Sequence, residues 1–86
     1  MNKLLEIIND WDPLDFFPLA PKDEYAGEAQ KIYEYIRGNH NLQVEHLATV
    51  INKIFVAAFG ADAYEENMEK CTEVARRILI YRNEIV

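Results

Sequence analysis

All three prolines of this 86-residue chain fall within one short segment, at Pro13, Pro18 and Pro21. Proline has no backbone N–H and disfavours helical geometry in the residue before it, so no regular helix can run through this segment. The segment, DWDPLDFFPLAPKDEY, also holds the only tryptophan and two of the four phenylalanines. We therefore expect an ordered crossover that runs extended from about Phe17 to Ala20.

The aromatic residues of the crossover need somewhere to pack. Asp12 precedes a proline and can cap a turn, which would bring the chain back toward the helices. We expect Trp11, Leu14, Phe16 and Phe17 to fold over the end of the helices, where each would contribute about 1.5–3 kcal/mol of burial. The crossover is thus predicted to be a hydrophobic lid that its prolines stiffen.

Four segments show apolar residues at helical spacing, and none shows the sustained alternation of a half-buried strand. The predicted helices run over about 3–11, 22–37 and 42–59, and from 62 into the region of 85. These patterns predict an all-α fold: a single domain, 1–86, built as a compact bundle of four helices, with an ordered proline- and aromatic-rich connector between the first and the second.

Several residues predict where these helices end. Gly38 is expected to stop the second helix in left-handed geometry, and Gly60 to end the third. Asp62, with Glu65 three residues later, resembles a capping box that would open the fourth helix. The third helix carries the broadest apolar face, so we expect neighbours to contact it from more than one side.

Composition excludes several classes of protein. Half of the residues are hydrophobic and 28% are charged, which is typical of a globular domain and not of a disordered chain. One cysteine cannot form an internal disulfide, no leader pattern is evident, and apolar stretches such as IFVAAF are short, so we expect a cytoplasmic protein without membrane spans. The net charge of −6 makes nucleic acid a poor partner.

Four motifs together resemble a known family. They are WDP, FFPLAPKDEYAGE, IFVAAFG, and Cys71 followed by ARRIL. This combination of aromatic, proline and acidic positions is similar to that of the YugE-like family, small all-helical bacterial proteins without an assigned function. The resemblance covers nearly the whole chain. It implies an all-α domain and assigns no functional residues.

The acidic residues near the connector do not match known metal sites. An EF-hand loop that started at Asp10 would need an oxygen ligand at Leu14 and a bidentate glutamate at Pro21. Glu24 and Glu28 share one side of a helix, but no Glu-x-x-His pair exists to complete a two-metal bundle site. We interpret these acids as helix caps and solvated surface.

The remaining reactive side chains also lack a recognisable pattern. His40 and His46 are six residues apart, which is too far for a helical metal pair. Cys71 lies on an apolar stripe between Met68 and Ala75, which predicts a buried thiol of raised pKa. We therefore predict no catalytic, metal-binding or cofactor-binding residue.

The leading hypothesis is a small non-catalytic protein-binding or regulatory module whose partner is another protein or a second copy. Tyr33 and Tyr35 point about 160° apart on a helix, so at least one should be exposed. Tyrosine is enriched at interfaces. The predicted interaction surface consists of Phe16, Phe17, Tyr33, Glu34 and Tyr35.

Two other functions stay open at this point. One is a small enzyme or ligand carrier with a site under the connector, 12–28, in which Asp12, Tyr25 and Glu28 would act. The other is an acidic inhibitor, or immunity-type protein, that neutralises a basic toxin.

Overall fold

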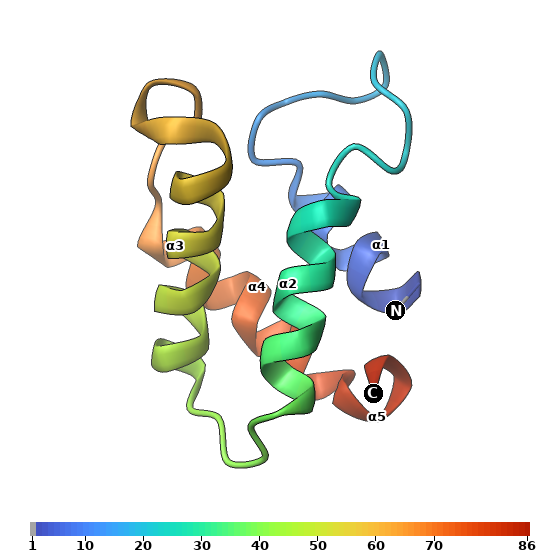
Figure 1. The fold of residues 1–86 in the computed structure, drawn as a ribbon, viewed down its shortest axis with the longest axis vertical. Coiled ribbons are helices and arrows are strands. Elements are labelled where there is room, and N and C mark those ends of the chain that lie inside the picture. Colours follow the sequence, from blue (N-terminus) through green and yellow to red (C-terminus); the bar gives the residue numbers. More distant parts are fainter. Residues whose placement is uncertain (1) are drawn as a thin grey trace.

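The computed structural model describes residues 2–86, in which all of the regular secondary structure is helical (Figure 1). The prediction of an all-α fold is confirmed, although the last predicted helix is divided at Tyr81. The helices are α1 (Asn2–Trp11), α2 (Ala26–Arg37), α3 (Val44–Ala63), α4 (Met68–Ile80) and α5 (Arg82–Ile85).

The first helix of the chain packs among the last ones. α3 and α4 share the largest helix interface, and α1 contacts α4, α2 and α5. In Figure 1, α2 and α3 lie side by side along the long axis, and α4 passes behind them. The connector between α1 and α2 arches over one end of the molecule.

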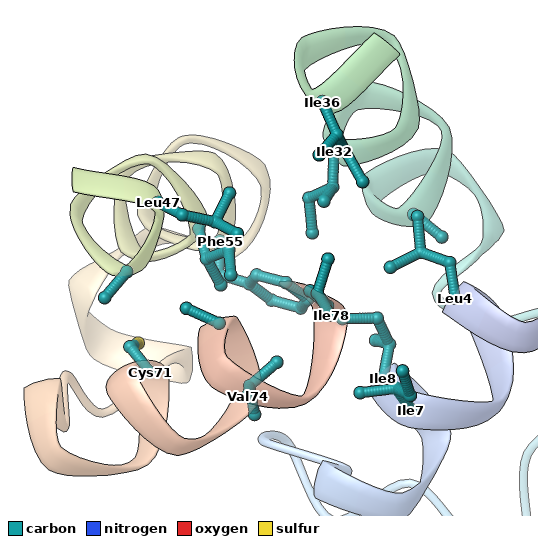
Figure 2. Close-up of a cluster of buried hydrophobic side chains, with 14 of the residues drawn as sticks. Leu4, Ile7, Ile8, Ile32, Ile36, Leu47, Phe55, Cys71, Val74 and Ile78 are labelled. Atoms are coloured by element: carbon teal, nitrogen blue, oxygen red, sulfur yellow. The ribbon is translucent and has the colours of Figure 1, made fainter. Parts of the chain in front are cut away.

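The core is formed where the helices meet (Figure 2). Apolar residues three or four positions apart put one stripe of each helix inside, as the sequence pattern predicts. Phe55 of α3 and Ile78 of α4 lie in the middle of the close-up, between the side chains of α1 and α2. The residues drawn there with labels are Leu4, Ile7, Ile8, Ile32, Ile36, Leu47, Phe55, Cys71, Val74 and Ile78.

Length and composition alone would let α3 cross a membrane. A core helix of a soluble protein passes the same test, and Leu47, Ile51 and Phe55 of α3 are fully buried here. Only 22% of the apolar stretch of α3 is buried, although α2 and α4 both contact this helix.

The two ends of α2 differ from the prediction. The helix begins at Ala26 and not near residue 22. Residues 21–26 form tight turns instead, because Glu24 N–H donates to the Pro21 carbonyl and Ala26 N–H donates to the Asp23 carbonyl. Gly38 is in right-handed geometry, so the predicted left-handed stop is wrong.

At the end of α2, side chains donate hydrogen bonds to carbonyls that a left-handed glycine cap would otherwise have helped to satisfy. Asn39 Nδ2 donates to the Tyr35 carbonyl at 2.7 Å. Arg82 Nη2 donates to the carbonyls of Ile36 and Asn39, at 2.7 and 3.0 Å. The last carbonyls of the helix are therefore satisfied from outside it.

The predicted capping box at Asp62 is wrong. Gly60 does break the helical geometry, with φ 81° and ψ 157°, but a short helical segment follows it and belongs to the end of α3. α4 begins only at Met68, after Asn67, whose side chain accepts a hydrogen bond from Lys70 N–H at 3.1 Å. Met68, placed on the buried stripe from sequence, is 43% exposed.

Candidate functional site

Asp12 organises the connector, residues 12–25. It follows the last turn of α1 with φ 45°, a left-handed conformation that aspartate tolerates better than most residues. Its carboxylate accepts hydrogen bonds from the amides of Phe16 and Phe17, at 2.9 and 3.1 Å. The predicted turn cap is therefore present, and it holds residues 12–17 in a closed loop.

Tyr25 ties the other end of the connector to the same carboxylate. Its hydroxyl donates to Asp12 Oδ1 at 2.7 Å and accepts from Leu14 N–H at 3.0 Å. Burial and the neighbouring carboxylate raise the pKa of Tyr25 above its ordinary value. Desolvation opposes ionisation of Asp12, but hydrogen bonds from Tyr25 and the two amides outweigh it and lower the pKa of Asp12. We call this pair the Asp12–Tyr25 clamp.

The chain reverses direction in the middle of the connector, so the predicted extended run from Phe17 to Ala20 is wrong. The Phe17–Pro18 peptide is cis, and Ala20 N–H donates to the Phe16 carbonyl at 2.9 Å. Because the clamp holds the amides of Phe16 and Phe17, the turn begins from a fixed position. Leu19 lies in this turn and is 97% exposed.

The connector packs as the predicted hydrophobic lid. Trp11, Leu14, Phe16 and Phe17 are all partly buried against the core. The Phe16 ring stacks on Tyr25 at 5.3 Å between centroids, and Trp11 meets Phe55 edge to face at 4.9 Å. Such aromatic pairs contribute about 0.5–1.5 kcal/mol beyond their burial.

A groove of about 520 Å³ lies between α1 and the turn of the connector. Asn9 crosses from one wall to the other, since its Nδ2 donates to the Lys22 carbonyl at 2.9 Å. Pro18 and Ala20, the neighbours of Leu19 in the sequence, both line the groove. The groove is lined by Asn2, Leu5, Glu6, Asn9, Asp10, Phe17, Pro18, Ala20 and Lys22.

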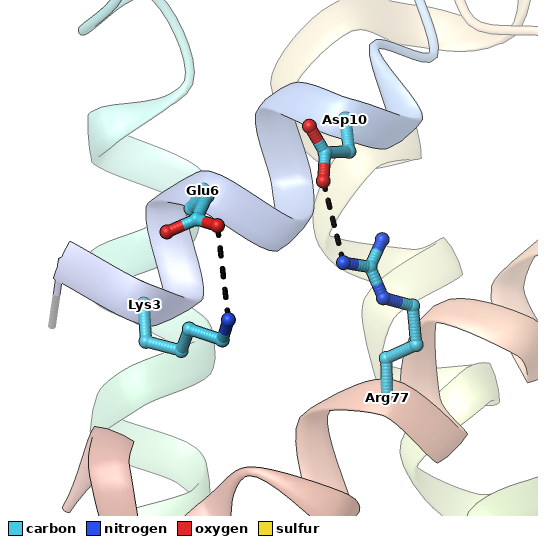
Figure 3. Close-up of polar contacts among 4 residues, drawn as sticks. All are labelled: Lys3, Glu6, Asp10 and Arg77. Atoms are coloured by element: carbon cyan, nitrogen blue, oxygen red, sulfur yellow. Dashed lines mark hydrogen bonds and ion pairs between the residues drawn. The ribbon is translucent and has the colours of Figure 1, made fainter.

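Two acidic residues of the groove form ion pairs (Figure 3). Asp10 Oδ2 lies 3.3 Å from Arg77 of α4, and Glu6 lies 3.7 Å from Lys3. The side chains of Asp10 and Glu6 are 59% and 62% exposed, so these pairs contribute little to stability and exchange readily with solvent.

Negative charge is concentrated in the part of the chain that forms this groove. Residues 2–28 form α1, the connector and the start of α2. They hold seven of the chain's 15 acidic side chains and two of its nine Lys and Arg. The acids are Glu6, Asp10, Asp12, Asp15, Asp23, Glu24 and Glu28, and the cations are Lys3 and Lys22.

The predicted interaction surface is divided between the two ends of α2. Phe16 and Phe17 belong to the lid beside the N-terminal end of the helix, whereas Tyr35 lies about 15 Å along it, in the last turn. Tyr33 and Tyr35 are both half-buried against the core, so the expectation that at least one of them is exposed is wrong, whereas Glu34 is exposed. The five residues therefore do not form one continuous surface.

The C-terminal end of α2 borders a smaller polar hollow of about 370 Å³. His40 and His46, separated in sequence, both line it, and His46 Nε2 lies 2.6 Å from the Tyr35 hydroxyl. Within residues 2–86, no group of three or more His, Cys, Asp or Glu side chains is placed to hold a metal ion.

Cys71 is buried, as the sequence predicts, and it lies in a small polar network that the apolar stripe did not indicate. The Tyr64 hydroxyl donates to Asn52 Oδ1 at 2.9 Å and lies 3.3 Å from Cys71 Sγ. Asn52 Nδ2 donates to Glu66 at 2.7 Å. Burial raises the pKa values of both Cys71 and Tyr64, so the thiol stays protonated near neutral pH.

Two residues of the alternative enzyme site, Asp12 and Tyr25, hydrogen-bond to each other, but neither they nor Glu28 lines the groove beneath the connector. Tyr25 is fully buried, and Asp12 borders a separate hollow beside Trp11 and Lys70. The groove beneath the connector is lined by other residues. The sequence did not indicate Leu5, Asn9, Pro18 or Ala20 as residues of a site.

One comparison with known proteins gives a match. A family model described as a domain of unknown function, DUF1871, matches residues 3–85. Curated proteins and solved structures give no match. Because the match spans nearly the whole chain, this protein belongs to the DUF1871 family.

Proposed function

We propose that this chain is a small non-catalytic protein-binding module. Its contact surface is the groove together with the turn that carries Leu19, which we call the groove–Leu19 surface. The observation that carries the proposal is Leu19: a large apolar side chain that is 97% exposed, in a connector held by the Asp12–Tyr25 clamp. Leu5, Phe17, Pro18 and Ala20 extend the apolar surface beside it.

The order of the connector favours binding. A segment that is already fixed loses little conformational entropy when a partner docks on it, so more of the contact energy becomes affinity. The clamp and the aromatic contacts of Phe16 fix this turn before any partner arrives. A flexible loop would present the same leucine at a higher entropic cost.

The reactive side chains support a non-catalytic role. Asp12 and Tyr25 are engaged with each other and with backbone amides, and Cys71 is a buried thiol of raised pKa. A general base or nucleophile needs a pKa suited to its task and access to substrate. These three groups instead stabilise the fold.

Affinity capture from native cytoplasm, followed by mass spectrometry, tests the proposal. The wild-type chain should retain a partner that the Leu19→Ser variant loses. Ile80→Ser is the matched control, because Ile80 is also exposed, at 68%, but lies on α4. Failure to capture a partner, or equal loss with both variants, would overturn the proposal.

A second candidate function is a carrier of a small apolar ligand. It is favoured by the groove's volume, which falls in the range of ligand pockets, and by its position beneath the connector. Native mass spectrometry of protein isolated from its source would show a retained ligand mass if this function holds. A bare chain mass would reject it.

The finer conclusions from the sequence also remain proposals. They are a compact bundle of four principal helices, a cytoplasmic location, no binding to nucleic acid or membranes, and a YugE-like relationship within the family. The acidic charge supports the lack of nucleic-acid binding, because it repels phosphate.

A further inference from the structure

We infer that the partner segment that docks on the groove–Leu19 surface is cationic and amphipathic, with a large apolar side chain flanked by Lys or Arg. This inference rests on the proposed function, and it names the chemical class of the partner. Three features support this inference: the position of the negative charge, the exposure of the acidic side chains and the apolar lining of the groove.

The part of the chain that forms the groove carries most of the net negative charge. Residues 2–28 carry most of the net charge of −6, and they include every residue that lines the groove. The lining itself holds two acids, Glu6 and Asp10, and one cation, Lys22, and the two acids pair with Lys3 and Arg77 outside it. Partners of opposite charge are steered to such a surface and held in register there.

The acids of the connector and of α1 are free to exchange partners. Asp15, Asp23 and Glu24 are exposed on the connector and form none of the ion pairs found in residues 2–86. In the pairs of Glu6 with Lys3 and Asp10 with Arg77, the two acidic side chains are themselves exposed. A cation from a partner can therefore pair with Glu6 or Asp10, while Lys3 keeps its place over the Tyr81 ring, 4.1 Å from the centroid.

The same charge excludes other occupants. A second copy docking through this surface would bring two concentrations of negative charge together, which is unfavourable. Nucleic acid and anionic lipid carry the same sign as the surface. The apolar residues Leu5, Phe17 and Leu19 in turn require an apolar side chain on the partner, so a purely basic segment would leave them uncovered.

Fluorescence anisotropy with a labelled amphipathic peptide of leucine and lysine tests this inference on the full chain. The matched probe is the same peptide with glutamate in place of lysine. The lysine peptide should bind and weaken steeply as salt rises, and the glutamate peptide should not bind. Leu19→Ala should weaken binding of the lysine peptide about tenfold, because its side chain would be buried in the complex.

Charge reversal shows whether the position of the acids matters. Asp23→Lys with Glu24→Lys should weaken the lysine peptide by about tenfold or more at low salt. Glu45→Lys with Glu69→Lys is the control: it changes the net charge equally, also near helix N-termini, but on α3 and α4. Equal weakening by both double variants, or binding of the glutamate peptide, would overturn the inference.

Failure of this inference can be told apart from failure of the proposed function. If affinity capture yields a partner whose loss depends on Leu19, but whose contact segment is neutral or acidic, the protein-binding role stands and the cationic partner does not. If capture fails and neither peptide binds, both fall.

Discussion

The Tyr25 hydroxyl donates to Asp12 Oδ1 at 2.7 Å, and this bond joins the first residue of the connector to its last. Thirteen positions separate the two residues, yet the chain between them is closed into one ordered loop. The bond explains how a segment with three prolines and many aromatic rings holds a defined shape without helical hydrogen bonding. Its removal gives the most direct tests of the structure.

We expect Tyr25→Phe to loosen the connector while leaving the core ring in place. The change removes the hydrogen bond to Asp12 and the one from Leu14 N–H. It should lower the free energy of unfolding by about 1–3 kcal/mol. Hydrogen exchange should become faster at the amides of Leu14, Phe16 and Phe17, and unchanged protection there would contradict the clamp.

Asp12 should make the stability depend on pH in acid. Its pKa in the folded protein lies below the ordinary value of 3.8, so its contribution is fully present above that pH and is lost as pH falls through the folded pKa. Asp12→Asn should remove part of this dependence and lower stability at neutral pH by about 1–2 kcal/mol. Urea unfolding followed by Trp11 fluorescence, from pH 6 down to pH 2, measures both effects.

Cys71 should react with thiol reagents only when the protein opens. The side chain is fully buried, and burial raises the pKa of its thiol. Labelling of native protein at pH 8 should therefore be slower than labelling in urea by about two orders of magnitude or more, since it needs a rare opening. Rapid stoichiometric labelling without denaturant would show that the polar network around Cys71 is open to solvent.

The start of α4 can be tested by a pair of substitutions. Asn67→Ala removes the side-chain cap that accepts from Lys70 N–H and should lower stability by about 1 kcal/mol. Asp62→Ala, in the capping box that the sequence suggested, should have a smaller effect. Thermal unfolding of both variants distinguishes the two starts, and a larger loss for Asp62→Ala would contradict the structure.

The helical fold could be predicted because burial follows local periodicity. The stripe of Leu4, Ile7 and Ile8 identifies the inner face of α1, and Cys71, Ala75 and Ile78 identify that of α4. Each stripe must be covered by another, whatever the topology. The sequence pattern therefore predicts the fold class and many of the core residues.

The ends of the helices could not be predicted, because several residues could cap equally well. Asp62 and Asn67 both suit a helix start, but Tyr64 lies between them in extended geometry and hydrogen-bonds to Asn52 of α3. That tertiary contact keeps the chain non-helical until Asn67. At Gly38, Arg82 from the far end of the sequence replaces the expected glycine cap.

The candidate site was only partly visible in the sequence. Trp11, Phe16 and Phe17 identify the lid, but the groove depends on how α1 lies against the turn of the connector, and no local pattern gives that arrangement. Two signals were present: Leu19 stands among prolines, where it cannot join a helical stripe, and the acids gather in the first third of the chain.

The position of α1 also bears on the order of folding. α3 and α4 are neighbours in sequence and share the largest interface, so they can pair early, with little chain to close. α1 must find α4 across a long loop, and Asp10 meets Arg77 at a separation of 67 residues. We expect the docking of the N-terminal helix to come late, so substitutions at Ile7 should speed unfolding more than they slow refolding.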